Sequence, residues 1–235
     1  GLESSVAYSI RDGAIVGTGE DFDFFRLGLY WPKADAPAQI IKPTGFEETI
    51  LSDLADGWLF GDASGIPTNN QRHAILFSAA DPETYINLHP AGSQYINSYG
   101  EAVLPANATY PNGVQVGIVA VEVVPGSGET FEHAAVWFGS AASFIDLHAF
   151  VPPAYPYSNA RGIDDAGNIY GTAYDLFGNY ISVRWSPSTT APCPADFNND
   201  TFVDDTDFVT FAAAYEQFSV PPADAAADFN ADGFV

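Results

Sequence analysis

The chain of 235 residues contains no methionine, a single cysteine and only seven lysines and arginines. Without methionine, Gly1 is not a translation start, so we expect a processed or fragmentary product, with room for a signal peptide already removed. The lone Cys193 cannot form a disulfide within the chain and is either free or paired with another molecule. The longest apolar run, residues 114–124, is too short for a membrane span.

Positive charge is scarce, and this scarcity limits the partners. Thirty acids against seven bases give a formal charge of −23. Such a surface repels phosphate backbones and anionic lipid, so we expect neither nucleic-acid nor membrane partners, and divalent cations are the natural counter-charge. The chain is 47% hydrophobic, which excludes a disordered protein and allows a sizeable core.

One short phrase recurs in the first 187 residues: a turn pair, an alternating strand and a glycine. It reads DGAIVG (12–17), DGWLFG (56–61), NGVQVG (112–117) and, less perfectly, AGNIYG (166–171). Asp-Gly and Asn-Gly favour the type I′ turn of a β-hairpin, because both central residues of that turn need a positive φ.

Three further phrases complete a unit of three or four short strands. A strand ending in Ile or Leu plus a polar residue precedes the glycine phrase at 5–12, 49–56 and 158–165. The glycine phrase is followed by a second phrase that begins with a small residue and ends with an aromatic one, at 28–31, 74–77, 134–137 and 182–185. A predicted outer strand then follows at 39–43, 85–90 and 144–149. The fourth unit stops at Trp185 without an outer strand, and we expect the segment around Leu2 to supply one and close a ring.

A period of roughly 45–55 residues with this strand content predicts the blades of a β-propeller. A single blade cannot bury both faces of its sheet, whereas stacked blades can, and ring closure protects the edges. We therefore expect residues 1–187 to form an all-β, propeller-like domain of about four units with negligible helix. A β-sandwich of irregular hairpins is the alternative.

These phrases resemble the extracellular repeats called HAF repeats. That pattern runs approximately Ser-x-Ala-x-x-Ile-Asn, a polar-Gly turn, a Val-Gly strand, Ala-x-x-Trp and an Asp-Leu strand, and residues 158–185 match it best. The resemblance covers residues 5–185. It implies an extracytoplasmic β-propeller-like domain and brings no catalytic residues with it.

The composition changes after residue 187. Residues 188–195 continue a small, polar, proline-bounded stretch and are predicted to be a linker. Residues 196–235 then hold nine acids and neither lysine nor arginine. The segment DFNNDTFVDDTD (196–207) has the ligand spacing of an EF-hand-type calcium loop, in which alternate residues present oxygen atoms to the ion. The predicted Ca²⁺ ligands are Asp196, Asn198, Asp200, the Phe202 carbonyl, Asp204 and Asp207.

The surroundings of this loop resemble one kind of calcium module. Apolar residues at 208, 211, 212 and 215 predict an exiting helix, whereas residues 189–195 cannot form an entering one. A loop with an exiting helix only, repeated once, resembles a type I dockerin, and its opening CPADFN resembles secreted proteins of planctomycete-like bacteria. Thr201 and Asp207 depart from the usual Gly and Glu at positions 6 and 12. A solvated Asp/Asn-rich turn is the alternative.

A second copy begins 32 residues later and is incomplete. Asp228, Asn230, Asp232 and the Phe234 carbonyl take positions 1, 3, 5 and 7, while positions 9 and 12 fall beyond Val235. Two expectations remain open: the native chain continues, or a neighbouring molecule supplies the missing oxygens and calcium links copies into an oligomer or filament.

Several other residues have both a functional and a structural interpretation. His89 and His148 take matching places in two units, as half-buried repeat positions or as ligand contacts at a blade edge. The remaining candidates are turn acids (Asp164, Asp165 and residues 19–24), sugar-stacking aromatics (Trp58, Tyr99, Tyr155 and Tyr157) and the glycosylation sequons at Asn107 and Asn199.

Two functions follow from these patterns. The first is a secreted, non-catalytic, calcium-binding structural or adhesive protein at the cell surface or in extracellular assemblies. Its partners would be a docking protein, further copies of itself or a glycan. The second is an extracellular carbohydrate-active enzyme that carries a dockerin as its docking tag. A carboxylate pair for sugar hydrolysis is adjacent only in space, so the sequence alone does not separate the two.

Overall fold

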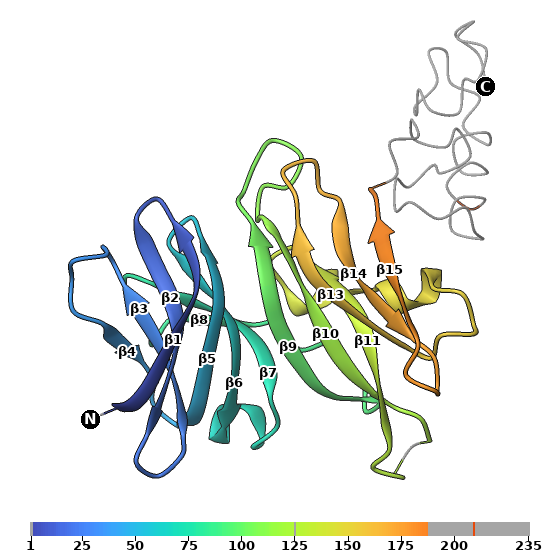
Figure 1. The fold of residues 1–235 in the computed structure, drawn as a ribbon, viewed down its shortest axis with the longest axis horizontal. Coiled ribbons are helices and arrows are strands. Elements are labelled where there is room, and N and C mark those ends of the chain that lie inside the picture. The colour runs from blue at the N-terminus through green and yellow to red at the C-terminus, as the bar shows by residue number, and fades with distance from the viewer. Residues whose placement is uncertain (1, 125, 188–208, 210–235) are drawn as a thin grey trace, which may run out of the picture. The chain divides into compact units, whose positions relative to one another are not determined.

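A computed structural model describes residues 2–124, 126–187 and 209 of the chain (Figure 1). The predicted linker and all the predicted calcium ligands, together with Cys193 and Asn199, lie outside these residues. Gly1–Ser186 forms one compact unit. Among the described residues, no helix is both long and apolar enough to cross a bilayer.

The described chain folds into four antiparallel sheets, each a meander in chain order. Blade 1 contains β1 (Leu2–Arg11), β2 (Ala14–Asp21), β3 (Arg26–Trp31) and β4 (Gln39–Ile41); blade 2 contains β5 (Phe46–Ala55), β6 (Trp58–Gly65), β7 (His73–Ser78) and β8 (Tyr85–Asn87). Blade 3 contains β9 (Tyr95–Leu104), β10 (Val114–Glu122), β11 (Thr130–Trp137) and β12 (Ile145–Asp146); blade 4 contains β13 (Tyr157–Ile163), β14 (Ile169–Tyr174) and β15 (Tyr180–Trp185). The helical segments described are short 3₁₀ turns at Ile66–Thr68, Ala141–Ser143 and Leu147–Phe150.

This topology confirms an all-β, propeller-like domain of four blades. Within the described residues, strands pair only inside their own unit, which is not the arrangement of a two-sheet sandwich. The prediction that the segment around Leu2 completes the fourth sheet is wrong, because β1 pairs with β2 in blade 1. A two-residue turn joins these strands, so their pairing closes a far shorter loop than pairing with blade 4 would.

The turn pairs behave as predicted in the first two units. Asp12 and Gly13 have φ values of 51° and 82°, and Asp56 and Gly57 have 52° and 77°. Both central residues are therefore left-handed, as a type I′ turn requires. In the third and fourth units only the glycine of each pair, Gly113 and Gly167, has a positive φ.

The repeated glycine is required by a bulge in the strand beside it. In every blade the first strand shifts register just after the residue that pairs with this glycine. A Cβ atom there would lie within about 2.0 Å of a carbonyl oxygen of the first strand, far closer than any contact allows. The glycines concerned are Gly17, Gly61, Gly117 and Gly171.

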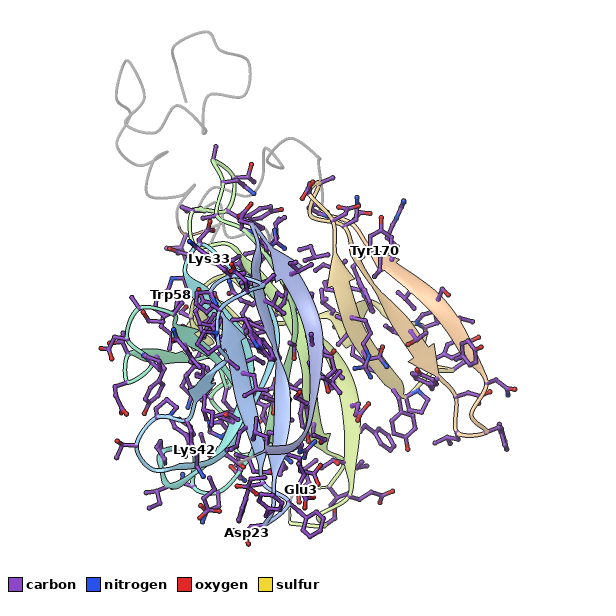
Figure 2. All side chains as sticks on the ribbon, turned by 60° about the vertical axis from the view of Figure 1, so that its left-hand side comes forward. Glu3, Asp23, Lys33, Lys42, Trp58 and Tyr170 are labelled. Carbon is purple, nitrogen blue, oxygen red and sulfur yellow. The ribbon has the colours of Figure 1, made fainter. Side chains whose placement is uncertain are left out.

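The core consists of three apolar clusters, one at each junction between consecutive blades, where side chains fill the space between the sheets (Figure 2). The first strand of a blade supplies apolar residues that pack on the preceding sheet. Leu51 and Leu54 pack with Val16 of blade 1, and Val103 packs with Phe60 of blade 2. Ala160 similarly packs with Val116 of blade 3.

Each junction also contains a buried hydroxyl group, which we call the latch hydroxyl. Thr49, Ser98 and Ser158 occupy the same register position in β5, β9 and β13 and are fully buried. They accept hydrogen bonds of 2.7, 2.9 and 2.9 Å from the backbone N–H groups of Gly28, Ala74 and Ala134 in the preceding blades. The donors are the small residues of the second phrase. A Cβ on Gly28 would lie only 2.8 Å from Leu51, which shows how closely the next blade approaches.

The latch hydroxyls also donate a hydrogen bond, so both of their polar functions are satisfied. Thr49 donates to the carbonyl of Ile41, whereas Ser98 and Ser158 face Nδ1 of His89 and His148 at 3.0 and 2.8 Å. A buried hydroxyl with no partner would cost about 1–3 kcal/mol, so this satisfaction stabilises the junction.

A bulge-facing glycine should tolerate no side chain. We expect Gly61→Ala to lower the free energy of unfolding by about 2 kcal/mol or more, because its Cβ would meet the Ile50 carbonyl at 1.9 Å. Gly162→Ala is the matched control, since it has open space and no positive φ. Urea denaturation measures both. Equal midpoints for the two variants would contradict the bulge explanation.

Removing a latch hydroxyl should weaken a junction without changing its shape. We expect Ser98→Ala to cost about 1–3 kcal/mol of unfolding free energy, because the Ala74 N–H and His89 Nδ1 lose their buried partner. Ser93→Ala, at an exposed serine just before β9, serves as the control. Thermal denaturation measures the stability of both variants. If Ser98→Ala is as stable as the parent protein, the Ser98 hydroxyl does not act as a latch.

Candidate functional site

The first strands of the four blades border a cleft of about 500 Å³. Each blade contributes to its wall, so the cleft exists only in the assembled domain. Its polar lining combines three carboxyl groups with one guanidinium, two phenols and a hydroxyl. The lining residues are Tyr8, Ile50, Ser52, Asp62, Tyr99, Gly100, Glu101, Ile118, Glu132 and Arg161.

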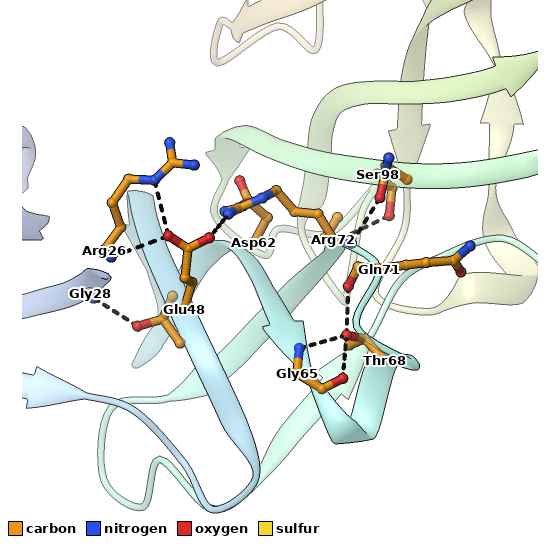
Figure 3. A network of polar contacts seen from close by, with 12 residues as sticks. Arg26, Gly28, Glu48, Asp62, Gly65, Thr68, Gln71, Arg72 and Ser98 are labelled. Carbon is orange, nitrogen blue, oxygen red and sulfur yellow. Dashed lines mark hydrogen bonds and ion pairs between the residues drawn. The ribbon is translucent and has the colours of Figure 1, made fainter. Parts of the chain in front are cut away.

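An ion-pair network fixes the carboxyl group of Asp62 at one wall of the cleft (Figure 3). Arg72 Nη1 donates to Asp62 Oδ2 at 2.6 Å, and the other terminal nitrogen of Arg72 pairs with Glu48. Arg26 Nε lies 3.5 Å from the same Glu48 carboxylate. The network joins blades 1 and 2, and the Arg72 backbone extends it to blade 3 by donating to Asn97 Oδ1 at 2.9 Å.

A second ion pair lies across the third and fourth blades. Arg161 on β13 pairs with Glu101 on β9, and both line the cleft. Glu132 on β11 also lines the cleft, and its charge adds a smaller contribution to the rise that burial causes in the pKa of Glu101. The cleft therefore contains more carboxyl groups than guanidinium groups.

Burial shifts the acid–base behaviour of these groups. Asp62 is only 4% exposed, and this desolvation raises its pKa to about 6 although Arg72 opposes the shift. Desolvation likewise raises the pKa of Glu101 and of Tyr99, with Arg161 opposing the shift of Glu101. A carboxyl group with a pKa near 6 keeps its proton in mildly acidic solution, where it can donate a hydrogen bond or act as a general acid.

The two repeat histidines prove to be structural. His89 is half-buried and stacks on His73 at 3.9 Å, and His148 stacks on His133 at 4.0 Å. His89 Nε2 lies 3.2 Å from the Tyr95 carbonyl, which only accepts, so Nε2 carries the proton and Nδ1 accepts from Ser98. Burial lowers the pKa of both His89 and His148, which keeps them neutral acceptors. The interpretation as half-buried repeat positions is confirmed.

The predicted turn acids likewise cap their own turns. Asp164 accepts from the backbone of Ala166 and Asn168 and from the Tyr170 hydroxyl. Asp21 accepts from the N–H groups of Asp23 and Phe25 in the acidic loop. Neither carboxylate needs a ligand to explain its place.

The four aromatic candidates do not form one site. Tyr99 lines the central cleft, whereas Trp58 borders two other hollows between blade turns. Tyr155 packs against the core cluster between blades 3 and 4, and the Tyr157 ring lies 4.6 Å from that of Phe131. Tyr99 is thus the one of these four that is placed for contact with a ligand in the central cleft.

Sequence reasoning missed the charged residues of the cleft and of the ion-pair network beside it, although the repeat contained a signal for three of them. Arg26, Arg72 and Glu132 each stand two positions before the small residue of the second phrase. A charged residue recurring at one register position of a strand marks a shared environment, which here is the axis where the blades meet. Asp62 and Arg161 carried no comparable signal.

No protein-family model, no curated protein and no solved structure matches this chain. Among the described residues, no group of three or more His, Cys, Asp or Glu side chains is arranged to hold a metal ion. The site is therefore characterised by its own geometry: a polar, carboxyl-rich cleft on the axis of a four-blade domain.

The raised pKa of Asp62 predicts a specific pH dependence of stability. The folded state binds this proton more tightly than the unfolded chain, whose carboxyl group has a pKa near 3.8, so ionised Asp62 lowers stability increasingly as the pH rises toward 6. Asp62→Asn removes that cost. We expect the variant to gain about 2–3 kcal/mol of unfolding free energy over the parent protein between about pH 4 and pH 6.5.

Urea unfolding of the parent protein and Asp62→Asn across this range gives the measurement. The titrations of the histidines are common to both proteins and cancel in the difference, and the effect of the Arg72 ion pair is already contained in the pKa of about 6. A difference that stays constant or falls with pH would show that burial does not raise the pKa of Asp62.

Proposed function

We propose that the chain is a secreted, calcium-binding structural or adhesive protein of the cell surface or extracellular space, and not an enzyme. In this proposal residues 1–187 are a HAF-type repeat domain that serves as a binding platform, and residues 196–235 are a dockerin-like module that takes up Ca²⁺. The observation that carries the proposal is the spacing of Asp196, Asn198, Asp200, Asp204 and Asp207, with the Phe202 carbonyl at position 7.

The composition supports calcium as the ion. Hard cations prefer carboxylate and carbonyl oxygens, and the predicted ligands are of this kind. The chain has a formal charge of −23, so copies repel one another unless cations neutralise them. Calcium-linked extracellular assembly, through the module or through its docking partner, is therefore part of the proposal.

The central cleft suggests what the platform would hold. Tyr8, Tyr99, Ser52 and the carboxyl groups of the lining offer flat aromatic surface and hydrogen-bonding groups in one place. A neutral, hydroxyl-rich ligand such as a glycan matches these groups, whereas an anionic ligand would be repelled. We therefore propose a glycan as the ligand of the repeat domain.

A second candidate function, a carbohydrate-active enzyme with a docking module, is favoured by one observation. Asp62 has a pKa of about 6 and shares the cleft with Glu101, whose pKa is also raised, and with Glu132. Glycoside hydrolysis uses a protonated and an ionised carboxyl group. Release of reducing ends from polysaccharides, abolished in Asp62→Asn and Glu132→Gln, would favour this enzyme over the binding protein.

The calcium proposal predicts a metal-coupled module. Four carboxylates crowded into one loop without the ion repel each other, so binding and folding should be linked. We expect calorimetry on the full chain to detect Ca²⁺ binding that Asp200→Ala weakens at least tenfold. Asp224→Ala, at an acid between the two loops, should bind like the parent.

Limited proteolysis provides the structural readout. Chelator should expose residues 196–218 to cleavage and leave the β domain intact. Absence of calcium binding in the calorimeter, or equal affinities for Asp200→Ala and the parent protein, would overturn the proposal.

A further inference from the structure

The junction between blades has two complementary halves, and the described domain leaves one half open at each end. The inserting half is the first strand of a blade: its latch hydroxyl, then a residue at the bulge, then a branched apolar residue. The receiving half is the outer face of the preceding blade's second and third strands. Three junctions use both halves, between blades 1 and 2, 2 and 3, and 3 and 4.

Blade 1 presents an inserting half that enters no other blade of the described domain. In the strand register, Ser5, Ala7 and Ile10 of β1 correspond to Thr49, Leu51 and Leu54 of β5. The three β5 residues are buried, with Leu54 only 7% exposed, whereas all three β1 residues are exposed and Ile10 is 66% exposed. We call Ser5, Ala7 and Ile10 the β1 face.

Among the described residues, blade 4 presents a receiving half that holds no inserting strand. Ser182 of β15 corresponds to the latch donors Gly28, Ala74 and Ala134, and it is exposed where they are buried. In β3 the N–H of Gly28 points away from β2, so the N–H of Ser182 points away from β14, at the open edge of its sheet.

The neighbours of Ser182 are open in the same way. Tyr170, the counterpart of Val16, Phe60 and Val116, is 43% exposed although those three are fully buried (Figure 2). Arg184, two residues after Ser182, is also exposed. We call Tyr170, Ser182 and Arg184 the β14–β15 face.

The two open faces lie at opposite ends of the row of blades and do not pair with each other. Figure 1 shows the sheets following one another in chain order, with β1 in the first and β15 in the last. Among the described residues, no hydrogen-bonded ladder joins blade 1 to blade 4. Within the residues that the structure describes, a single copy therefore leaves both halves unfilled.

The charges of the two faces are complementary. At the first junction, Tyr30 of β3 and Asp56 of the next blade's turn border one hollow, and Leu76 and Asn112 do the same at the second. The corresponding residues at the open ends are Arg184 and Asp12, which carry opposite charges. A fourth junction would thus bring a guanidinium beside a carboxylate.

We propose that the β1 face of one copy inserts into the β14–β15 face of a second copy of this chain and forms a fourth blade junction between molecules. Ser5 of one copy accepts from the backbone N–H of Ser182 of the next, Ile10 packs beside Tyr170, and Asp12 pairs with Arg184. The contact is head-to-tail, so it closes a ring where the rotation between copies allows and otherwise extends a chain of copies. This contact does not rest on the calcium module.

The test measures the mass of the full chain in chelator, which silences calcium-mediated assembly. Light scattering at about 100 µM protein and physiological salt, where screening limits repulsion between acidic copies, should give a multiple of the 25.1 kDa monomer. Ile10→Asp should weaken association at least about tenfold. Ile40→Asp, at a similarly exposed isoleucine on β4 outside both faces, should associate like the parent protein.

Charge reversal gives a second test, in which restored association shows that the variant chains still fold. Arg184→Glu should weaken association, and adding Asp12→Lys to the same chain should restore it, because each junction then regains an opposite-charge pair. A monomer in chelator would overturn the proposal, as would parental association of Ile10→Asp. Assembly that requires Ca²⁺ would also overturn it and would assign association to the C-terminal module instead.

Discussion

Each junction of this domain depends on one buried hydroxyl group that binds backbone of the preceding blade. Thr49, Ser98 and Ser158 accept from an N–H group and donate to a carbonyl oxygen or an imidazole nitrogen. Such a group must meet both partners at once, because an unsatisfied hydroxyl in an apolar junction is costly. The latch thereby selects one register between neighbouring sheets, which apolar packing alone does not do, and it confines the residue opposite to glycine or alanine.

The paired histidines follow from the same constraint. A hydroxyl that has accepted from a backbone N–H still has a proton to donate, and a neutral imidazole offers an acceptor of the right reach. Burial disfavours the charged form of both imidazoles and lowers their pKa, and His133 adds to this effect at His148, so His89 and His148 remain acceptors. His89 and His148, which the sequence offers as candidate ligand contacts, instead accept the hydrogen bonds of two latch hydroxyls.

The bulges and glycines place the charged residues of the cleft. Because every first strand bulges at the same place, side chains next to the bulge are turned toward the axis shared by the blades. Tyr8, Ser52 and Glu101 reach the cleft in this way, and Asp62 joins them from the strand that carries the repeat glycine. The ion pairs with Arg72 and Arg161 hold the carboxyl groups of Asp62 and Glu101 there, while burial raises the pKa of both groups.

The sequence by itself determined the number of units, the order of strands in each unit and the turns of the first two units. These depend on local alternation and on Asp-Gly pairs, and local signals survive whatever the rest of the chain does. The calcium spacing of residues 196–207 is a local signal of the same kind, and it stays a prediction because those residues lie outside the described structure. Only the tertiary structure decided that β1 belongs to blade 1 and that, within the described residues, blades 1 and 4 do not pair. It also decided that Asp62, Glu101, Glu132 and Arg161 meet in one cleft, because their distances and their pKa values depend on how separate blades pack, and no spacing along the chain records that packing.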